Sequence, residues 1–412
     1  MDFLLKNLYF FSGFSSASGP LYLPLYLDHH FALDKDQIGI LLSLIPVISL
    51  VSTPLMTWMG EHKIGLKNAT ILCAFFGIIT FDLYAIVRTN TSTLVFIIGL
   101  CVLNALLASP VGTLLDSLVL ILSKDYGKQR LWCSISWGLG SLCTGLIIDY
   151  FGLDFMFVLF TVSSLIFLVL LSFLPSTPLS DASRGSNDAL EEQVNREDEE
   201  APLLDEPKVK DDSLSKVLFR PSTLFFLLSI TLIGMVFSLI QSFLFIYMSS
   251  ELVISSSLIG LTTPLSIAFE LPVFYYSEKL IKVAGTSMMI VSVHVLLIAR
   301  LLVYMVLNQT SAIFILPVEL IHGLAFALTW AAGLENSKRI APTTNKSTFV
   351  SIFCTLYNNV GGFLGTYVGG KIYQDYGHIY LWMFCILLLF VSILSFVTST
   401  FLESKHENGT ET

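Results

Sequence analysis

The stretch from Tyr126 to Tyr150, YGKQRLWCSISWGLGSLCTGLIIDY, decides how the rest of the chain is interpreted. We expect it to begin as a basic loop and to continue as an apolar helix that is long enough to cross a membrane. Four residues spaced at i, i+4, i+7 and i+11 share one face of this helix: Arg130, Ser134, Trp137 and Ser141. This face combines a cation, an aromatic ring and two hydroxyls inside an apolar segment.

Arginine offers a rigid, planar fork of hydrogen-bond donors, and the tryptophan indole offers a flat apolar surface with one donor. A polar, ring-shaped solute such as a sugar needs both surfaces together, so the spacing of Arg130 and Trp137 predicts a site for such a solute. The alternative interpretation is that Arg130 anchors the cytoplasmic end of the helix and that Trp137 lies at the membrane interface.

The composition is that of a polytopic membrane protein. Of the 412 residues, 54% are hydrophobic and 13% are charged, whereas soluble domains have about 25% charged residues. The six cysteines lie in apolar segments without a CxxC pair, which predicts neither a disulfide framework nor a zinc site. We find no catalytic motif, metal cluster or phosphate-binding loop, and therefore expect no enzyme activity, no cofactor and no nucleic-acid partner.

Apolar segments of about 20 residues mark candidate spanning helices. Twelve segments fit, and they lie near 4–27, 37–59, 68–88, 93–122, 130–150, 154–174, 221–249, 257–281, 285–306, 311–334, 347–371 and 379–402. We therefore predict an all-α membrane protein with one six-helix bundle over 1–175, another over 221–403, and a tail over 404–412. The polar segment 176–220 between them is acidic and rich in Ser and Pro, which predicts a disordered linker.

The positively charged residues set the orientation. With the N-terminus in the cytoplasm, all but four of the 22 Lys and Arg residues fall on the cytoplasmic side, together with the linker and the C-terminus. The four exceptions are Lys35, Arg88, Arg300 and Lys371.

The two halves of the chain resemble each other. LGSLCTG at 139–145 matches LGTYVGG at 364–370, and three glycines recur at the same spacing in both places. Tyr26 precedes an Ile-Gly pair by the same interval as Tyr247 does. Two matches between corresponding helices predict a duplication of a six-helix unit.

Five of the ionisable residues within the predicted spans form the candidate polar site: Asp116, Glu270, Arg300, Glu319 and His322. Glu319 and His322 are three residues apart, so they share a helix face and could exchange a proton. Arg300 on the preceding helix would favour the charged form of Glu319. The alternative is a static ion pair that only fixes helix packing.

The twelve predicted helices and the cytoplasmic linker resemble the major facilitator superfamily. YGKQRLWCSISWGL also resembles the helix-five motif FGRxRMxGxxGWxL of oligosaccharide:proton symporters of the lactose permease type, including their eukaryotic relatives. This resemblance implies that Arg130 hydrogen-bonds substrate hydroxyls and that Trp137 stacks on the sugar ring. It also places Arg300 and His322 at the arginine of helix nine and the histidine of helix ten.

The chain departs from the lactose permease pattern at most of its other charged positions. Gly112 stands at the helix-four glutamate, with Asp116 one turn away, and Glu270 is displaced by about one turn on helix eight. Helix ten reads Glu319-Leu-Ile-His322 where the family has Lys-x-x-His, and Asn358 replaces the helix-eleven lysine. Galactoside specificity is therefore not expected, and the coupling chemistry must be rearranged or lost.

These features together predict a secondary active transporter for a small polar solute, of the sugar or nucleoside-like kind, in a lipid bilayer, with protons as the coupling ion. The expected substrate-binding residues are Asp116, Arg130, Trp137, Glu270 and Asn358, and the expected proton-coupling residues are Arg300, Glu319 and His322. An uncoupled facilitative transporter and a non-transporting receptor or scaffold are the alternatives.

The predicted linker contains EDEEAPLLDEP, in which Glu199 precedes Leu203 and Leu204 as in an acidic dileucine motif. This pattern resembles the signal that clathrin adaptor complexes read, which implies an endosomal, lysosomal or vacuolar membrane. The alternative is that the linker only tethers the two bundles, in which case the plasma membrane is the expected location.

Overall fold

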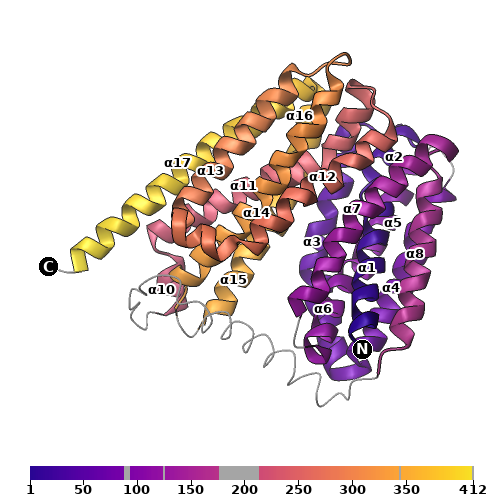
Figure 1. The fold of residues 1–412 in the computed structure, drawn as a ribbon, viewed down its shortest axis with the longest axis horizontal. Helices are drawn as coiled ribbons and strands as arrows, with labels where there is room; N and C mark the ends of the chain where they lie inside the picture. The colour runs from indigo at the N-terminus through magenta and orange to yellow at the C-terminus, as the bar shows by residue number, and fades with distance from the viewer. Residues whose placement is uncertain (88–92, 124–125, 176–212, 343–344, 411–412) are drawn as a thin grey trace. The chain divides into compact units, whose positions relative to one another are not determined.

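The computed structural model describes residues 1–87, 93–123, 126–175, 213–342 and 345–410, and these residues form helices joined by short connections (Figure 1). The first part of the chain contains α1 (Asp2–Ser18), α2 (Leu23–His29), α3 (Lys35–Met59), η1 (Gly60–Ile64), α4 (Leu66–Asp82), η2 (Leu83–Ala85), α5 (Thr93–Ala108), α6 (Pro110–Leu122), α7 (Tyr126–Phe151) and α8 (Phe155–Ser172). The second part contains α10 (Leu214–Leu218), α11 (Pro221–Ile246), η3 (Tyr247–Glu251), α12 (Ser256–Tyr275), α13 (Ser277–Val306), η4 (Ala312–Phe314), α14 (Ile315–Ile340), α15 (Lys346–Cys354), η6 (Thr355–Val360), α16 (Gly361–Tyr376) and α17 (His378–Thr410).

Within these described residues, ten helices are long and apolar enough to cross a membrane. The prediction of an all-α membrane protein is therefore confirmed. The first and eleventh predicted spans, 4–27 and 347–371, are helical but interrupted. The first breaks between α1 and α2 at Pro20, which has no backbone N–H to continue a helix, and the eleventh changes to a π-helix over Thr355–Val360.

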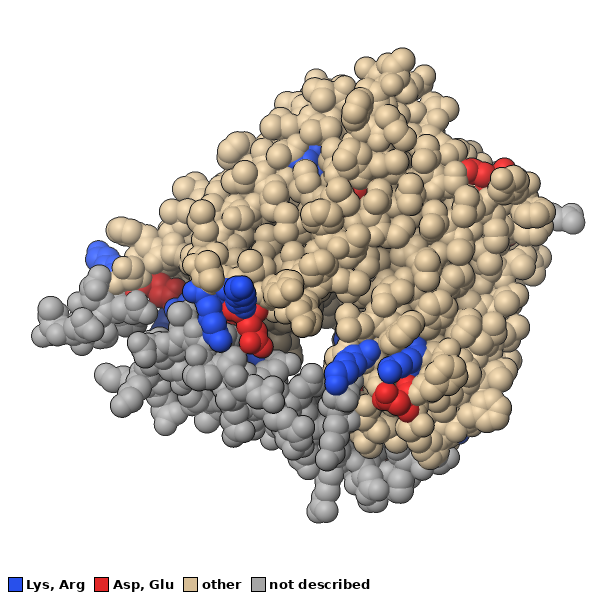
Figure 2. Space-filling view, in the orientation of Figure 1, with Lys and Arg blue, Asp and Glu red and all other residues tan. Residues whose placement is uncertain are grey.

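The surface is suited to contact with lipid. Figure 2 shows a face on which uncharged residues predominate and charged side chains are few. On α17, exposed apolar side chains recur every three or four residues and form one stripe along the helix: Leu387, Phe390, Leu394, Val397 and Phe401. A stripe of this length that faced water would be costly, and acyl chains are its natural environment.

The chain divides into two compact units, one made of residues 1–193 and 243–267 and the other of 194–242 and 268–412. In the first unit, α1 lies along α7 and α8, and α4 packs against α5, α6 and α8. In the second unit, α13 packs against α14 and α17, and α14 also contacts α15.

Corresponding glycines make corresponding contacts in the two units. A Cβ atom added to Gly140 of α7 would lie 2.8 Å from the backbone oxygen of Phe14 in α1. A Cβ atom added to Gly365 of α16 would lie 2.5 Å from the backbone oxygen of Met235 in α11. In both units the absence of a side chain allows two helix backbones to touch, as the predicted duplication requires.

The ends of the same two helices also correspond. Gly152 follows α7 with a φ of 95°, and Gly377 follows α16 with a φ of 85°. A left-handed residue directly after a helix ends it, and glycine adopts that conformation without a Cβ clash. The matching glycines found in the sequence therefore have matching structural roles.

Candidate functional site

A polar cluster in the first unit joins α1, α6 and α7. The hydroxyl of Tyr9 donates a hydrogen bond to Oδ1 of Asp116 at 2.6 Å. Nη1 of Arg130 donates to Oδ2 of the same carboxylate at 3.0 Å, and it also donates to the hydroxyl of Tyr126. Asp116 is displaced by one turn from the acid position implied by the resemblance, and it nevertheless meets Arg130.

The start of α7 sets the position of Arg130. The expectation of a basic loop at this place was wrong, because the helix already begins at Tyr126. Tyr126 and Arg130 are therefore four residues apart on one helical face, with the guanidinium 5.9 Å from the ring centroid. Tyr126 thus contacts the arginine from within α7, and Asp116 contacts it from the neighbouring helix α6.

Arg130 keeps hydrogen-bonding capacity for another molecule. Its side chain is 59% exposed, while that of Asp116 is 27% exposed. Within the described part of the chain, Nε and Nη2 of Arg130 have no hydrogen-bond partner, and both contacts that it makes use Nη1. A guanidinium that is fixed on one side and open on the other is suited to bind a hydroxyl or carboxylate of a solute.

The other residues of the predicted α7 face differ in how far they are buried. Trp137 is half-buried, but Ser141 is fully buried. The Ser141 hydroxyl accepts a hydrogen bond from Thr263 at 2.9 Å, and its carbonyl accepts one from Tyr22 at 2.8 Å. Ser141 therefore fixes packing within the first unit, and the open part of this face extends from Arg130 to Trp137.

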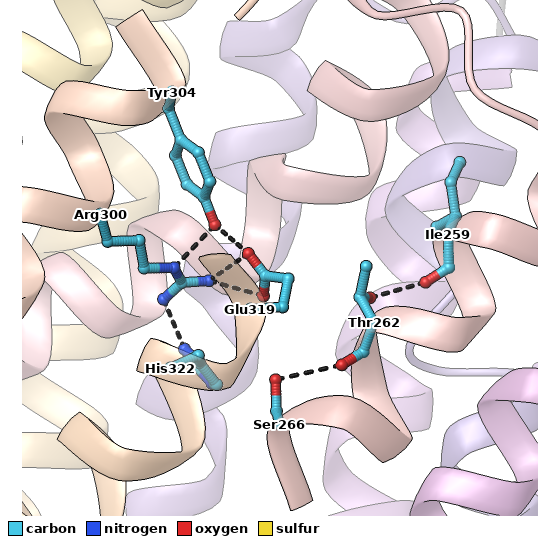
Figure 3. Close-up of polar contacts among 7 residues, drawn as sticks. All are labelled: Ile259, Thr262, Ser266, Arg300, Tyr304, Glu319 and His322. Carbon is cyan, nitrogen blue, oxygen red and sulfur yellow. Dashed lines mark hydrogen bonds and ion pairs between the residues drawn. The ribbon is translucent and has the colours of Figure 1, made fainter. Parts of the chain in front are cut away.

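A second polar cluster lies in the second unit, between α13 and α14, and is shown in Figure 3. Nη2 of Arg300 donates to both carboxylate oxygens of Glu319, at 3.1 Å and 2.8 Å. Nε of Arg300 donates to the Tyr304 hydroxyl at 2.7 Å, and this hydroxyl in turn donates to Oε1 of Glu319. Arg300 is 0% exposed and Glu319 is 2% exposed, so the pair is enclosed by protein.

The hydrogen bond between Arg300 and His322 defines the state of the histidine. Nη1 of Arg300 lies 2.6 Å from Nδ1 of His322. Because a guanidinium has only donors, Nδ1 must accept, and it carries no proton in this arrangement. His322 is therefore neutral, with its proton on Nε2, and it can take up a second proton only if the bond to Arg300 breaks.

The remaining predicted polar residues are placed separately from these clusters. Glu270 is half-buried on α12, and the structure gives its carboxylate no hydrogen bond or ion pair with any residue that it describes. Asn358 is exposed in η6, and its amide donates to the carbonyl of Cys354 at 3.1 Å. A further ionisable residue of α13, His294, is buried and contacts Ile290 and Ser392, which makes it part of the helix packing.

Three tyrosines complete the two clusters and were not predicted from the sequence. Tyr126 and Tyr304 lie four residues from Arg130 and Arg300, and this spacing could have identified them. Tyr9 is 107 residues from Asp116, and no local pattern connects the two. The ammonium of Lys67, at the start of α4, donates to the carbonyls of Ser172 and Leu174 near the end of α8.

The predicted sorting motif Glu199, Leu203 and Leu204 lies outside the described residues. In the part of the chain that the structure describes, no three His, Cys, Asp or Glu side chains are grouped as a metal site would require.

Comparison with known proteins identifies the family. The model of the MFS_1 like family matches residues 3–384. The maltose permease of Geobacillus stearothermophilus is 25% identical over 383 residues, covering 91% of this chain and 87% of the permease. The crystal structure of a variant of the nucleoside transporter NupG superimposes with a TM-score of 0.77 at 15% identity, covering 97% of this chain and 99% of that one.

A crystal structure of a D-xylose-proton symporter also shares the fold, with a TM-score of 0.65 at 12% identity over 97% of this chain and 95% of that one. Identities this low establish the architecture and leave the substrate open. The family match nevertheless spans nearly the whole chain, and the helices are those of a membrane protein. This chain belongs to the MFS_1 like family and is a multi-pass membrane transporter of the major facilitator superfamily.

Proposed function

We propose that the protein is a secondary active transporter that couples the movement of a small polar solute to protons by alternating access. The solute binds the open side of Arg130 next to Asp116, and Trp137 contacts its ring. Glu270 and Asn358 are the further residues that we propose for substrate binding. Arg300, Glu319 and His322 respond to the proton.

The cluster of Arg300, Glu319 and His322, with its enclosed Arg300–Glu319 ion pair, is the observation that carries this proposal. Charged groups inside a membrane span are costly, and they persist mainly where transport or proton transfer needs them. Here a carboxylate and an imidazole share one guanidinium, so the protonation of either acceptor changes the hydrogen bonds of the other. The cluster therefore has more than one possible arrangement of the same donors.

Protonation of Glu319 would weaken its bond with Arg300, because a neutral carboxyl attracts the guanidinium less strongly than a carboxylate. The arginine would then interact mainly with Tyr304 and with the acceptor nitrogen of His322. Two such arrangements would favour different conformations of the transporter, and the proton would shift the population between them. This is the requirement for coupling.

The test uses the purified full chain in proteoliposomes, with a panel of labelled sugars and nucleosides and with or without a pH gradient. We expect the parent protein to accumulate one of these solutes only when the gradient is present. Glu319→Gln should abolish accumulation and leave counterflow exchange partly intact, because the site can still open to both sides while the coupling group is fixed as neutral.

Asp82→Asn is the matched control. Asp82 is a half-buried acid at the end of a spanning helix; it accepts hydrogen bonds from Thr161 and lies outside the cluster. This variant should still accumulate solute. Solute uptake by the parent that is independent of the pH gradient would instead support an uncoupled facilitator, in which Arg300 and Glu319 form a static pair.

We also propose that the dileucine motif at Glu199, Leu203 and Leu204 directs the protein to endosomal, lysosomal or vacuolar membranes through clathrin adaptor complexes. An extended cytoplasmic segment can place two leucines in a pocket while the acid meets a basic patch. The double variant Leu203→Ala, Leu204→Ala should move a tagged protein to the cell surface. An unchanged distribution would reduce the segment to a tether.

A further inference from the structure

Three aromatic rings follow one another on a single face of α14. His322, Phe326 and Trp330 are spaced at i, i+4 and i+8, so their side chains project from the same side of the helix. The rings of His322 and Phe326 are within 12° of parallel with centroids 6.5 Å apart. Those of Phe326 and Trp330 are within 19° of parallel at 6.1 Å. We call these three side chains the ring ladder.

Other helices of the second unit support the ring ladder with a second layer of aromatic residues. Phe237 of α11 packs edge-on against both His322 and Phe326, with centroids 5.4 and 5.9 Å away. Tyr357 of η6 and Phe353 of α15 pack against Trp330, at 5.6 and 5.8 Å. The rings of the ladder are therefore held in place by side chains from three further helical segments.

The two layers differ in their accessibility. The supporting rings of Phe237, Phe353 and Tyr357 are buried. The three ladder rings are only half-buried, although side chains from three other helical segments pack against them. Rings that only filled a core would be covered on all sides, whereas part of each ladder ring is left uncovered by the described residues.

One polar group belongs to the ladder itself, and another lies in the buried layer that supports it. The first is Nε2 of His322, which carries the proton because Nδ1 accepts from Arg300. The second is the hydroxyl of Tyr357, which is buried and makes no hydrogen bond with any residue that the structure describes. Tyr357 lies in the π-helix Thr355–Val360, and π-helical turns of this kind are frequent at functional sites.

From these observations we propose that the ring ladder is a subsite for the flat heteroaromatic ring of the transported solute. The ring stacks on the ladder, and an acceptor on its edge, such as a carbonyl oxygen or a ring nitrogen, receives the hydrogen bond from Nε2 of His322. This proposal rests on the proposed transport function and narrows its substrate to a polar molecule that carries a base-like ring.

The chemistry of the ladder distinguishes such a ring from a saturated sugar. A heteroaromatic ring has apolar faces and confines its polar atoms to its edge, so its faces can meet aromatic side chains without loss of hydrogen bonds. A sugar placed there would press several hydroxyls against rings that offer few partners, and unpaired polar groups are costly. Stacking on an aromatic side chain accounts for about 1–3 kcal/mol per base in proteins that bind single strands.

The experiment compares uridine, adenosine and ribose as probes, since ribose is the same sugar without a base. Binding to the purified full chain is measured in detergent by the shift in melting temperature, which does not depend on transport. We expect the two nucleosides to bind and ribose to bind at least tenfold more weakly, as the loss of one stacked ring predicts.

Variants locate the binding surface. Phe326→Leu and Trp330→Leu should each raise the Kd for uridine about tenfold, while Trp330→Phe, which keeps a ring, should change it much less. Phe390→Leu is the matched control, since Phe390 is an exposed ring on α17 outside the ladder. A melting curve without ligand shows whether each variant is folded.

The proposal is overturned if the parent binds neither nucleoside, if ribose binds as tightly as uridine, or if the folded leucine variants retain the parent Kd. These outcomes are distinct from failure of the proposed function. A protein that accumulates sugars with a pH gradient but ignores nucleosides would keep the transport proposal and reject the ring subsite. Nucleoside binding without gradient-dependent uptake would keep the ring subsite and reject the transport proposal.

Discussion

The two polar clusters use the same residue types in opposite environments. Arg130 and Arg300 each have a tyrosine four residues away, and each meets a carboxylate from a neighbouring helix. The Arg130 side chain is 59% exposed, and the Arg300 side chain is 0% exposed. In the first cluster only Nη1 of the arginine donates to a described residue. In the second cluster each guanidinium nitrogen donates to a protein acceptor.

Under the proposed function, this difference separates a substrate-binding cluster from a proton-coupling cluster. An exposed ion pair contributes little to stability, because water competes for both charges. Removal of one partner from a buried pair is strongly destabilising, because the other charge is then unpaired in a medium of low dielectric. We therefore expect the first cluster to respond to substitution mainly in substrate affinity, and the second mainly in stability and in proton dependence.

The largest effect should follow the loss of one charge from the buried cluster. Glu319→Ala should lower the free energy of unfolding by about 3–5 kcal/mol, because Arg300 then remains as an unpaired buried cation. Asp116→Ala in the exposed cluster should lower it by about 1 kcal/mol or less. Denaturant unfolding in detergent measures both values, and equal losses would remove the distinction between the clusters.

Arg130→Lys should reduce transport by about tenfold to a hundredfold, since an ammonium keeps the charge but cannot reproduce the planar fork of donors. The change should appear in uptake at equal surface abundance while the melting temperature stays near that of the parent. The corresponding variant Arg300→Lys should lower the melting temperature. Parent-like transport by Arg130→Lys would show that this arginine is only a cytoplasmic anchor.

Replacing each tyrosine by phenylalanine tests the same comparison, because it removes a single hydroxyl from each cluster. Tyr304→Phe leaves Nε of Arg300 without its acceptor and removes one hydrogen bond to Oε1 of Glu319 in a fully buried site, at an expected cost of about 1–3 kcal/mol. Tyr126→Phe should cost less than about 1 kcal/mol, because Arg130 is open to other partners. Thermal melts of the two variants decide this, and a larger effect at Tyr126 would contradict the assigned roles.

The smallest effect concerns Trp137. Trp137→Tyr should raise the KM for the solute about threefold or less, whereas Trp137→Ala should raise it about tenfold, because only tyrosine keeps a ring that can stack. Initial uptake rates over a range of solute concentrations separate KM from the maximal rate. Identical KM values for the two variants would exclude ring contact at this position.

Much of the fold could be predicted from the sequence, because a membrane restricts a chain to a few solutions. Backbone groups in lipid must be satisfied within each segment, so long apolar runs become helices. The paired glycines predicted the duplication, and Gly140 and Gly365 make equivalent helix contacts. The interruptions at Pro20 and over Thr355–Val360 were missed, because segments of continuous hydrophobicity conceal local changes of helix type.

The candidate site was predictable in part. Glu319 and His322 are three residues apart, and helical geometry places them on one face. The sequence predicted that Ser141 shares a helix face with Arg130 and Trp137, but spacing could not show that Tyr22 and Thr263 occupy its carbonyl and hydroxyl. Such contacts join distant segments and leave no periodic pattern.

The length of the apolar segments thus determined which residues are membrane-embedded, and helical spacing determined which of them share a face. The tertiary structure decided how these residues are used. It enclosed Arg300 with its acceptors and left one side of Arg130 open, and it fixed the proton of His322 on Nε2 through a bond from α13. The physical reason is that burial and hydrogen-bond direction depend on neighbours brought together by folding, which a local period of 3.6 residues does not specify.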